Sequence, residues 1–301
     1  MSRSVRHTPE GFLQANGLSI CFDAFGEPAD PAVVLIMGMG AQMVGWDDDF
    51  CERLAGRGFR VIRFDNRDAG KSTRFDHVGT PDILAAMTQA WLRVPVHAPY
   101  LLSDMALDVV GLLDALKIDG AHFVGASMGG TIAQQLALQH PRRVRSLTSI
   151  MSTTGDPGLP QPKPWALTAL FKPTPLEREA YIDHYAKLWR MLRGTAFPDE
   201  EARDRVRAAR NHARGLNPAG AARQLAAILA SGSRRRALRH VTAPTLVIHG
   251  DADPLVPLAA GVDTAASIPG AELMVLEGMG HALPLPMWPR IIDGIVRIAG
   301  R

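Results

Sequence analysis

The feature that most constrains this chain is a serine between two glycines, placed where an apolar run gives way to a helical pattern. Residues 125–129 read Gly-Ala-Ser-Met-Gly and follow the short apolar run 121–124, which has the length of a buried strand. After them, residues 131–138 carry apolar side chains at helical spacing. The order is therefore strand, sharp turn, helix.

A turn of this kind exposes the hydroxyl of Ser127 at the edge of a sheet. The serine must adopt an unfavourable backbone conformation, and the residues two positions away must be almost free of side chain, which Gly125 and Gly129 satisfy. The turn also aims the Met128 backbone N–H toward an oxygen that becomes negative when Ser127 attacks a carbonyl. The pattern predicts a nucleophilic serine; the alternative is that Ser127 only caps the following helix.

Apolar runs of strand length recur along the chain and alternate with helical patterns. After an opening hairpin over 12–25, further strands are predicted at 31–37, 59–64, 144–150, 243–248 and 271–276, with helices at 49–55 and 101–116. Repeated strand–helix units predict an α/β fold with a mostly parallel central sheet and helices on both faces.

The alternation stops between residues 155 and 236. This segment opens with a stretch rich in proline and glycine and continues as several helical patterns rich in Arg and Ala. We interpret 155–236 as a helical cap inserted after the sixth strand, and we assign residues 1–154 and 237–301 to the core. A chain of 301 residues, 47% of them hydrophobic, is long enough for such a core.

A nucleophilic serine needs a base that takes its proton and an acid that orients the base. In an α/β sheet these groups are expected on loops that leave the strands, in the order serine, acid, histidine. The loop after 271–276 contains His281 beside glycines, and we predict that it is the general base. The loop after 243–248 offers Asp251 and Asp253 as the acid, and Asp251 could equally form a turn.

Two further residues near these loops are less favoured for a catalytic role. Asp156, just after the preceding strand, is a third candidate acid. His249 is interpreted as structural. A second oxyanion donor is expected in the loop after 31–37, where the Met39 backbone N–H stands between Gly38 and Gly40. The alternative is an ordinary glycine-rich turn.

Composition argues against several other functions. The chain has 33 basic and 30 acidic residues, which leaves little net field, so no nucleic-acid partner is predicted. The basic run 234–239 is interpreted as a solvated face of a helical stretch. Cys21 and Cys51 form no pattern typical of a disulfide framework or a zinc site. No apolar stretch is long enough to span a membrane, and we therefore expect a cytoplasmic protein.

Two glycine motifs that invite a nucleotide-binding interpretation are incomplete. Gly70-Lys71-Ser72 lacks the earlier glycine of a phosphate loop, because position 65 is Asp. The Gly38-x-Gly40 pair lacks the third glycine of a dinucleotide fingerprint, because position 43 is Met. No cofactor and no metal ion are therefore predicted.

Taken together, these segments resemble the α/β-hydrolase fold superfamily over essentially the whole chain, in its serine carboxylesterase branch. The segments are Met37-Gly38-Met39-Gly40 with Trp46, residues 64–72, Gly125-x-Ser127-x-Gly129, Gly250-x-x-Asp253 and Gly278-Met279-Gly280-His281. The first and last of them are most similar to aclacinomycin methylesterase-like enzymes.

The resemblance implies specific roles for several residues. It favours Asp253 over Asp251 as the acid, and it implies that Asp65 and Arg67 are structural. Many relatives carry His where this chain has Met37. That departure removes a side-chain hydrogen bond that would stiffen the oxyanion loop, but it leaves the backbone donors.

The resulting hypothesis is a carboxylic ester hydrolase that works through an acyl-enzyme on small to medium hydrophobic esters. In this hypothesis Ser127 is the nucleophile, His281 the base and Asp253 the acid. The aromatic residues Trp165, Phe171 and Trp189 either make the cap pocket apolar or form the core of the cap. The alternatives are a C–C bond hydrolase or perhydrolase with the same triad, and a non-catalytic ligand receptor on the same fold. A homodimer is left open.

Overall fold

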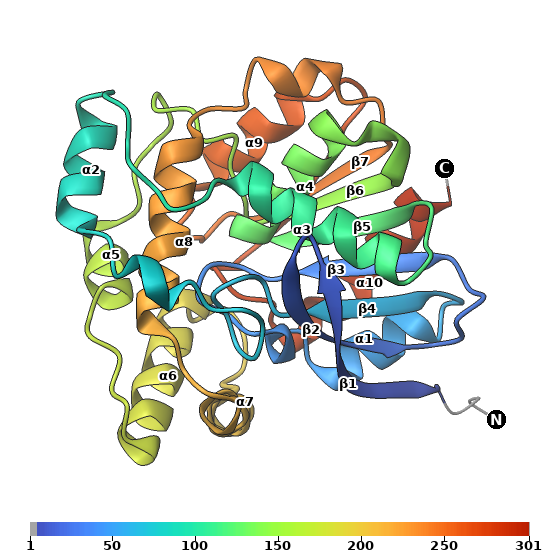
Figure 1. Ribbon diagram of the computed structural model, residues 1–301, viewed down its shortest axis with the longest axis horizontal. Helices are drawn as coiled ribbons and strands as arrows, with labels where there is room; N and C mark the ends of the chain where they lie inside the picture. The colour runs from blue at the N-terminus through green and yellow to red at the C-terminus, as the bar shows by residue number, and fades with distance from the viewer. Residues whose placement is uncertain (1–4, 301) are drawn as a thin grey trace.

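One eight-stranded sheet forms the centre of the computed structural model, which describes residues 5–300 (Figure 1). The strand order is β1-β2-β4-β3-β5-β6-β7-β8. Strand β2 runs antiparallel to β1 and β4, and the remaining neighbours are parallel. The predicted mostly parallel α/β sheet is therefore confirmed.

The strands lie close to the predicted positions. They are β1 (His7–Ala15), β2 (Leu18–Phe25), β3 (Ala32–Ile36), β4 (Arg60–Phe64), β5 (Ala121–Ala126), β6 (Val144–Ile150), β7 (Thr245–Gly250) and β8 (Glu272–Leu276). The α-helices of the core are α1 (Asp48–Ala55), α2 (Ile83–Trp91), α3 (Leu102–Ala115), α4 (Met128–Gln139), α9 (Leu258–Ser267) and α10 (Trp288–Ala299). Helices α2, α9 and α10 lie outside the predicted elements.

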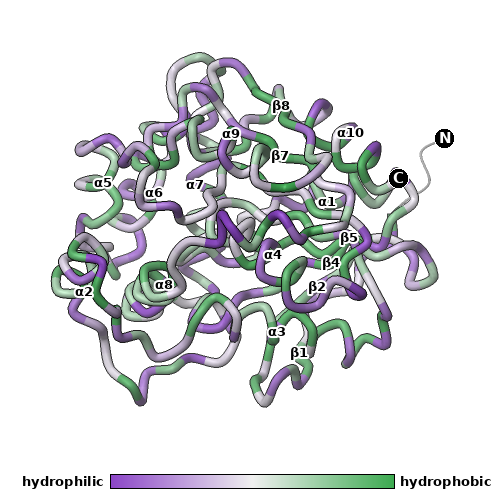
Figure 2. Tube along the Cα trace, turned by 90° about the horizontal axis from the view of Figure 1, so that it is seen from above, coloured by the Kyte–Doolittle hydropathy of each residue, from purple (hydrophilic) through white to green (hydrophobic). Residues whose placement is uncertain are grey.

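Two hydrophobic clusters hold the layers together, one on each face of the sheet. Helices α3 and α4 pack on one face and α1 and α10 on the other (Figure 1). Strand β3 contributes Val34 and Ile36 to the first cluster, and Val33 and Leu35 to the second. Side chains alternate along a strand, so a strand buried on both faces is apolar at every position. Figure 2 colours much of the tube near β4, β5 and β7 as hydrophobic.

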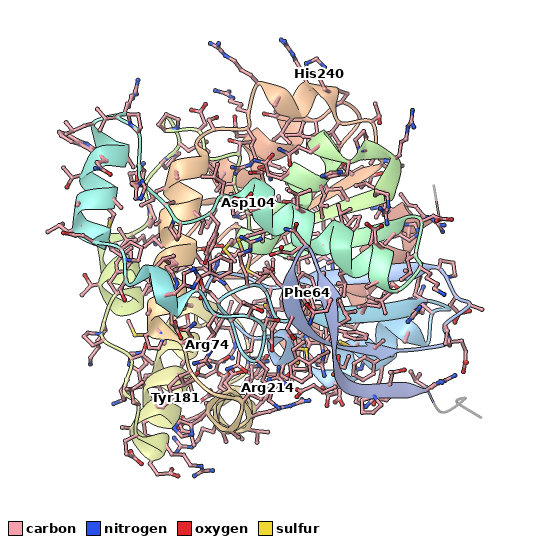
Figure 3. The ribbon with its side chains drawn as sticks, viewed as in Figure 1. Phe64, Arg74, Asp104, Tyr181, Arg214 and His240 are labelled. Atoms are coloured by element: carbon pink, nitrogen blue, oxygen red, sulfur yellow. The ribbon has the colours of Figure 1, made fainter. Side chains whose placement is uncertain are left out.

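Four helices lie between β6 and β7, in the segment that breaks the strand–helix alternation. They are α5 (Pro164–Leu170), α6 (Arg178–Arg193), α7 (Glu201–Arg214) and α8 (Pro218–Ser231). We refer to them as the inserted helices. They lie beside the sheet rather than over its faces, and Figure 3 shows Tyr181 of α6 among them, whereas Phe64 lies at the end of β4. Among residues 5–300, no helix has the length and apolar character that a membrane span requires.

Helix α8 is tied to the core by a buried ion pair. The Arg223 guanidinium donates to both carboxylate oxygens of Asp68, at 2.8 and 2.7 Å, and each residue is 1% exposed. The Tyr100 hydroxyl donates to the same carboxylate at 2.7 Å. The loop after β4 therefore holds α8 through a contact that is buried from solvent.

The predicted solvated face at 234–239 is wrong for its first residue. Arg234 is 5% exposed and lies before a short 3-10 helix at Ala237–His240, not inside an α-helix. Its guanidinium donates to the Gln134 side chain at 3.0 Å and to the Thr153 carbonyl at 3.2 Å. Burial lowers its pKa to about 10. The acceptors of this arginine are neutral oxygens from two other segments of the chain. The run of basic residues around Arg234 does not indicate that such acceptors are present.

Candidate active site

Ser127 occupies the sharp turn between β5 and α4. Its backbone has φ 54° and ψ −119°, a conformation that is unfavourable for a residue with a side chain. A Cβ atom on Gly125 would lie 2.2 Å from the Gly129 carbonyl oxygen, and one on Gly129 would lie 2.0 Å from the Ile36 carbonyl oxygen. Both positions therefore require glycine, because the turn packs against its own backbone and against β3.

The structure brings Ser127, His281 and Asp253 together from three different loops. Ser127 Oγ lies 3.1 Å from His281 Nε2, and His281 Nδ1 lies 2.7 Å from Asp253 Oδ2. The histidine and the aspartate are each 5% exposed. The three residues follow β5, β7 and β8, which run parallel, so their loops leave the same edge of the sheet.

Asp253 is held in place by its own loop. Its Oδ1 accepts hydrogen bonds from the Leu255 and Val256 amides at 2.9 and 2.8 Å, which leaves Oδ2 for His281. Asp251 is engaged elsewhere, because its Oδ1 accepts the Gly278 amide at 2.7 Å and joins the two loops. The two aspartates thus have separate structural roles, and only Asp253 contacts the histidine.

The other two candidates from the sequence do not reach Ser127. Asp156 accepts the amide of Gly158 at 2.9 Å in its own turn. His249 is fully buried and donates from Nε2 to the Val256 carbonyl at 2.8 Å, while the same nitrogen lies 3.8 Å from Asp253 Oδ2. Burial lowers the pKa of His249. A neutral His249 therefore supports the loop that carries Asp253.

The loop after β3 lies directly against the serine. A Cβ on Gly38 would be 3.2 Å from Ser127 Cβ, so this glycine permits the close approach. The loop is fixed by side chains from elsewhere: Asn66 donates to the Met37 carbonyl at 3.0 Å, and the Gly40 amide donates to Gln224 Oε1 at 2.7 Å.

Gln224 is a residue of this site that sequence reasoning missed. It lies on α8, is fully buried, and its amide nitrogen donates to the Arg67 carbonyl at 2.7 Å. It thus bridges the Gly38–Gly40 loop and the loop after β4. The Met37 side chain has no N–H or O–H group to donate within this loop, and Gln224 holds the loop from an inserted helix. No local motif marks a glutamine inside a helix for this role.

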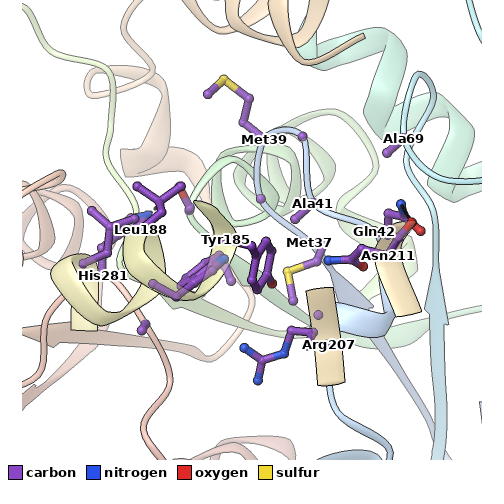
Figure 4. Close-up of a pocket in the computed structure, with 18 of the residues that line it drawn as sticks. Met37, Met39, Ala41, Gln42, Ala69, Tyr185, Leu188, Arg207, Asn211 and His281 are labelled. Atoms are coloured by element: carbon purple, nitrogen blue, oxygen red, sulfur yellow. Dashed lines mark hydrogen bonds between the residues drawn. The ribbon is translucent and has the colours of Figure 1, made fainter. Parts of the chain in front are cut away.

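A cavity of about 280 Å³ opens beside Ser127 and His281 (Figure 4). Its walls come from the loop after β3 and from the inserted helices, and aromatic residues of α6 line it: Tyr181, Tyr185 and Trp189. Of the three aromatics expected from the sequence, Trp189 lines the cavity. The other two, Trp165 and Phe171, are 43% and 40% exposed and contribute neither to its walls nor to a buried core.

Three arginines of the cavity wall are each paired with two acidic side chains. The pairs join Arg193 to Glu200 and Asp204, Arg203 to Asp47 and Glu200, and Arg207 to Asp47 and Asp204. These guanidinium groups are therefore already neutralised within the protein.

Over residues 5–300, no group of three or more His, Cys, Asp or Glu side chains is arranged to hold a metal ion.

The chain belongs to the α/β-hydrolase family. A family model described as "alpha/beta hydrolase fold" matches residues 31–286. The resemblance seen in the sequence motifs is thereby confirmed for the family.

Particular relatives include methylesterases. The rhodomycin D methylesterase of Streptomyces peucetius is 32% identical over 299 residues, which cover 92% of this chain and 93% of that protein. A 2-hydroxy-6-oxononadienedioate/2-hydroxy-6-oxononatrienedioate hydrolase of Cupriavidus pinatubonensis is 31% identical over 256 residues, and the match covers 83% of this chain and 80% of that protein. The solved meta-cleavage product hydrolase of Pseudomonas fluorescens shares the fold with a TM-score of 0.75 at 21% identity, over 96% of this chain and 97% of that one.

Proposed function

We propose that this protein is a serine-dependent carboxylic ester hydrolase. The observation that carries the proposal is the continuous hydrogen-bonded chain from Ser127 Oγ through His281 to the buried Asp253. Ser127 attacks the ester carbonyl while His281 takes its proton and passes it to the leaving alkoxide. A water molecule, deprotonated by His281, then attacks the acyl-enzyme, and the acid leaves as Ser127 regains its proton. Asp253 orients the imidazole and stabilises its charged form.

The oxyanion of each tetrahedral intermediate is assigned to the backbone amides of Met39 and Met128. The Met128 amide begins α4, where unpaired N–H groups point out of the helix. The Met39 amide belongs to the loop that Gly38 allows to approach Ser127. Residues 155–236, which contain the inserted helices, would act as a cap over the core formed by residues 1–154 and 237–301, because they supply much of the cavity wall.

A second candidate function is C–C bond hydrolysis with the same triad, as the name of the Cupriavidus relative indicates for that protein. A dioate carries two carboxylates, and at least one remains away from the scissile bond. The three arginines of the cavity wall are paired with acidic residues and are not available to bind it. An uncharged ester therefore fits this cavity better, and the names of the methylesterase relatives indicate ester hydrolysis for those proteins.

Covalent labelling combined with substrate comparison tests the proposal. A fluorophosphonate probe is expected to modify Ser127, detected by mass spectrometry of the peptide that contains it. The same preparation should hydrolyse p-nitrophenyl esters from acetate to dodecanoate, with an optimum set by the cavity, and should leave a 2-hydroxy-6-oxo-dienoate intact. Labelling without ester turnover, together with cleavage of the dienoate, would favour the C–C hydrolase instead.

Replacing Gln224 with methionine is expected to lower kcat about tenfold with little change in KM. The Gly40 amide loses its acceptor, and the loop that carries the Met39 donor is no longer fixed. The effect should stay below the roughly 10²–10³-fold cost of removing an oxyanion donor outright. The measurement is steady-state kinetics, paired with inhibition by a boronic acid that mimics the tetrahedral intermediate.

The control for this variant is Gln161→Met, which changes an exposed glutamine in the same inserted segment. Binding of the boronic acid should weaken in parallel with kcat/KM in Gln224→Met and should not change in the control. If Gln224→Met only lowers the melting temperature and keeps both its kcat and its boronic acid affinity, Gln224 does not position the oxyanion loop.

A further inference from the structure

Asn211 places an unused hydrogen-bond acceptor in the wall of the cavity. The residue lies on α7, is 5% exposed, and its side-chain Oδ1 has no hydrogen-bond partner. Figure 4 shows it on the opposite side of the cavity from His281, with Tyr185 between them. A buried acceptor without a partner is costly and rare in native structures. The free oxygen therefore points to a ligand group that enters the cavity.

The neighbours of Asn211 in the wall leave its side-chain oxygen without a donor. Its backbone carbonyl accepts the Gln42 side chain at 2.9 Å. Burial raises the pKa of Tyr181, and a side-chain interaction with Asn211 opposes that rise, so the two side chains are neighbours in the wall. Gln42 is itself saturated, because it also donates to the Gly215 carbonyl and accepts from Arg214. Of the side-chain oxygens of Gln42 and Asn211, only Asn211 Oδ1 therefore has no hydrogen-bond donor.

The other walls of the cavity constrain the polarity and the charge of the ligand. The neighbouring rings of Tyr181, Tyr185 and Trp189 lie 5.7 to 5.8 Å apart and form an aromatic surface. The paired arginines offer no free cation for an acidic ligand. Two buried donors of the wall, Trp46 Nε1 and Arg193 Nε, also lack hydrogen bonds, so the experiment must separate donor groups from acceptor groups on the ligand.

We propose that Asn211 Oδ1 accepts a hydrogen bond from a hydroxyl group of the substrate, remote from the ester that Ser127 attacks. The substrate class is then an uncharged ester whose apolar body carries a hydroxyl at the far end of the cavity. This inference rests on the proposed ester hydrolysis for the position of the scissile bond. Asn211 is a binding and specificity residue in this proposal, and it takes no part in proton transfer.

The test uses binding to the full-length Ser127→Ala protein, so that no probe is consumed. The probes are methyl esters of straight-chain acids of six to twelve carbons that end in a hydroxyl, a methoxy or a methyl group. Trp46, Trp189 and Trp288 line the cavity, and their fluorescence reports binding. At the best chain length, the hydroxyl probe is expected to bind about tenfold more tightly than the methyl probe, as a neutral hydrogen bond allows.

A second substitution assigns this preference to Asn211. Asn211→Leu, made in the Ser127→Ala protein, should bind the hydroxyl and methyl probes equally. The control Val206→Ala changes a residue of the same helix that is 70% exposed, and it should keep the tenfold preference. Circular dichroism of all three proteins checks that α7 and its neighbours remain folded.

Each other outcome overturns a defined part of the proposal. Equal binding of the hydroxyl and methyl probes to Ser127→Ala, or no binding of any probe, removes the hydroxyl subsite. Preference for the methoxy probe reassigns the contact to a donor such as Trp46 Nε1. A preference for the hydroxyl probe that survives Asn211→Leu places the acceptor elsewhere. If the hydroxyl preference is found but wild type hydrolyses none of these esters, the subsite stands and the proposed ester hydrolysis fails.

Discussion

Replacing Ser127 with alanine is expected to lower kcat/KM for p-nitrophenyl esters by about 10³-fold or more. The alanine removes the attacking oxygen but keeps the cavity, so binding of the ester changes little. Turnover that remains would come from the backbone donors and from water in the site. The measurement is a time course at enzyme concentrations high enough to detect slow release of p-nitrophenol, with wild type beside the variant.

Two aspartates of one loop provide a matched control for this expectation. Asp253→Asn should also lower kcat severely, because an amide cannot stabilise the charged imidazole and favours the wrong tautomer of His281. Asp251→Asn should change kcat little, because the asparagine oxygen still accepts the Gly278 amide. If Ser127→Ala turned over esters as fast as wild type, or if the two aspartate variants lost activity equally, the proposed triad would be wrong.

Replacing Arg223 with methionine is expected to lower the free energy of unfolding by about 3–5 kcal/mol. The variant leaves the Asp68 carboxylate buried without the guanidinium that donates to both of its oxygens. Burial opposes ionisation of Asp68, but Arg223, together with hydrogen bonds from the Phe75 amide and the Tyr100 hydroxyl, outweighs it, so the pKa of Asp68 in the native protein is lowered. Urea unfolding at pH 7, followed by circular dichroism, measures the loss.

A solvent-exposed ion pair serves as the comparison. Arg57 Nη1 lies 2.5 Å from Asp293 Oδ1, but the two side chains are 44% and 65% exposed, so Arg57→Met should cost less than about 1 kcal/mol. The double variant Asp68→Asn/Arg223→Met should be more stable than Arg223→Met alone, because it removes the unpaired charge. A loss in Arg223→Met as small as that in Arg57→Met would show that this pair does not tie α8 to the core.

Several parts of the fold follow from local patterns in the sequence. A strand buried on both faces must be apolar throughout, as in β3, and a serine turn packed against β3 must be flanked by glycine. The order of Ser127, Asp253 and His281 along the chain matches successive loops at one edge of a parallel sheet. The apolar run of a strand and the residues of one turn or loop are neighbours in the chain, so these constraints leave a readable pattern, and the order of the loops follows from the parallel sheet.

Other features depend on segments that are distant in the chain. Arg234 belongs to a run of like charges, yet it is buried because Gln134 and Thr153 happen to supply its acceptors. Trp165 and Phe171 are aromatic residues of the kind that line apolar pockets, yet both are largely exposed to solvent, one in α5 and the other just after it. Whether a polar or aromatic side chain is buried depends on what packs against it, and no local period encodes that.

The sequence by itself determined the alternating strands and helices, the serine turn between Gly125 and Gly129, and the loops that carry Asp253 and His281. The resemblance favoured Asp253 over Asp251, and the tertiary structure shows the contact of Asp253 with His281; only the tertiary structure decided that Gln224 holds the Gly38–Gly40 loop and that Asn211 leaves an acceptor in the cavity. The reason is physical. Backbone conformation and strand burial are set by short-range sterics and hydrophobic periodicity, whereas a hydrogen-bond partner is selected by three-dimensional packing of segments far apart in the chain.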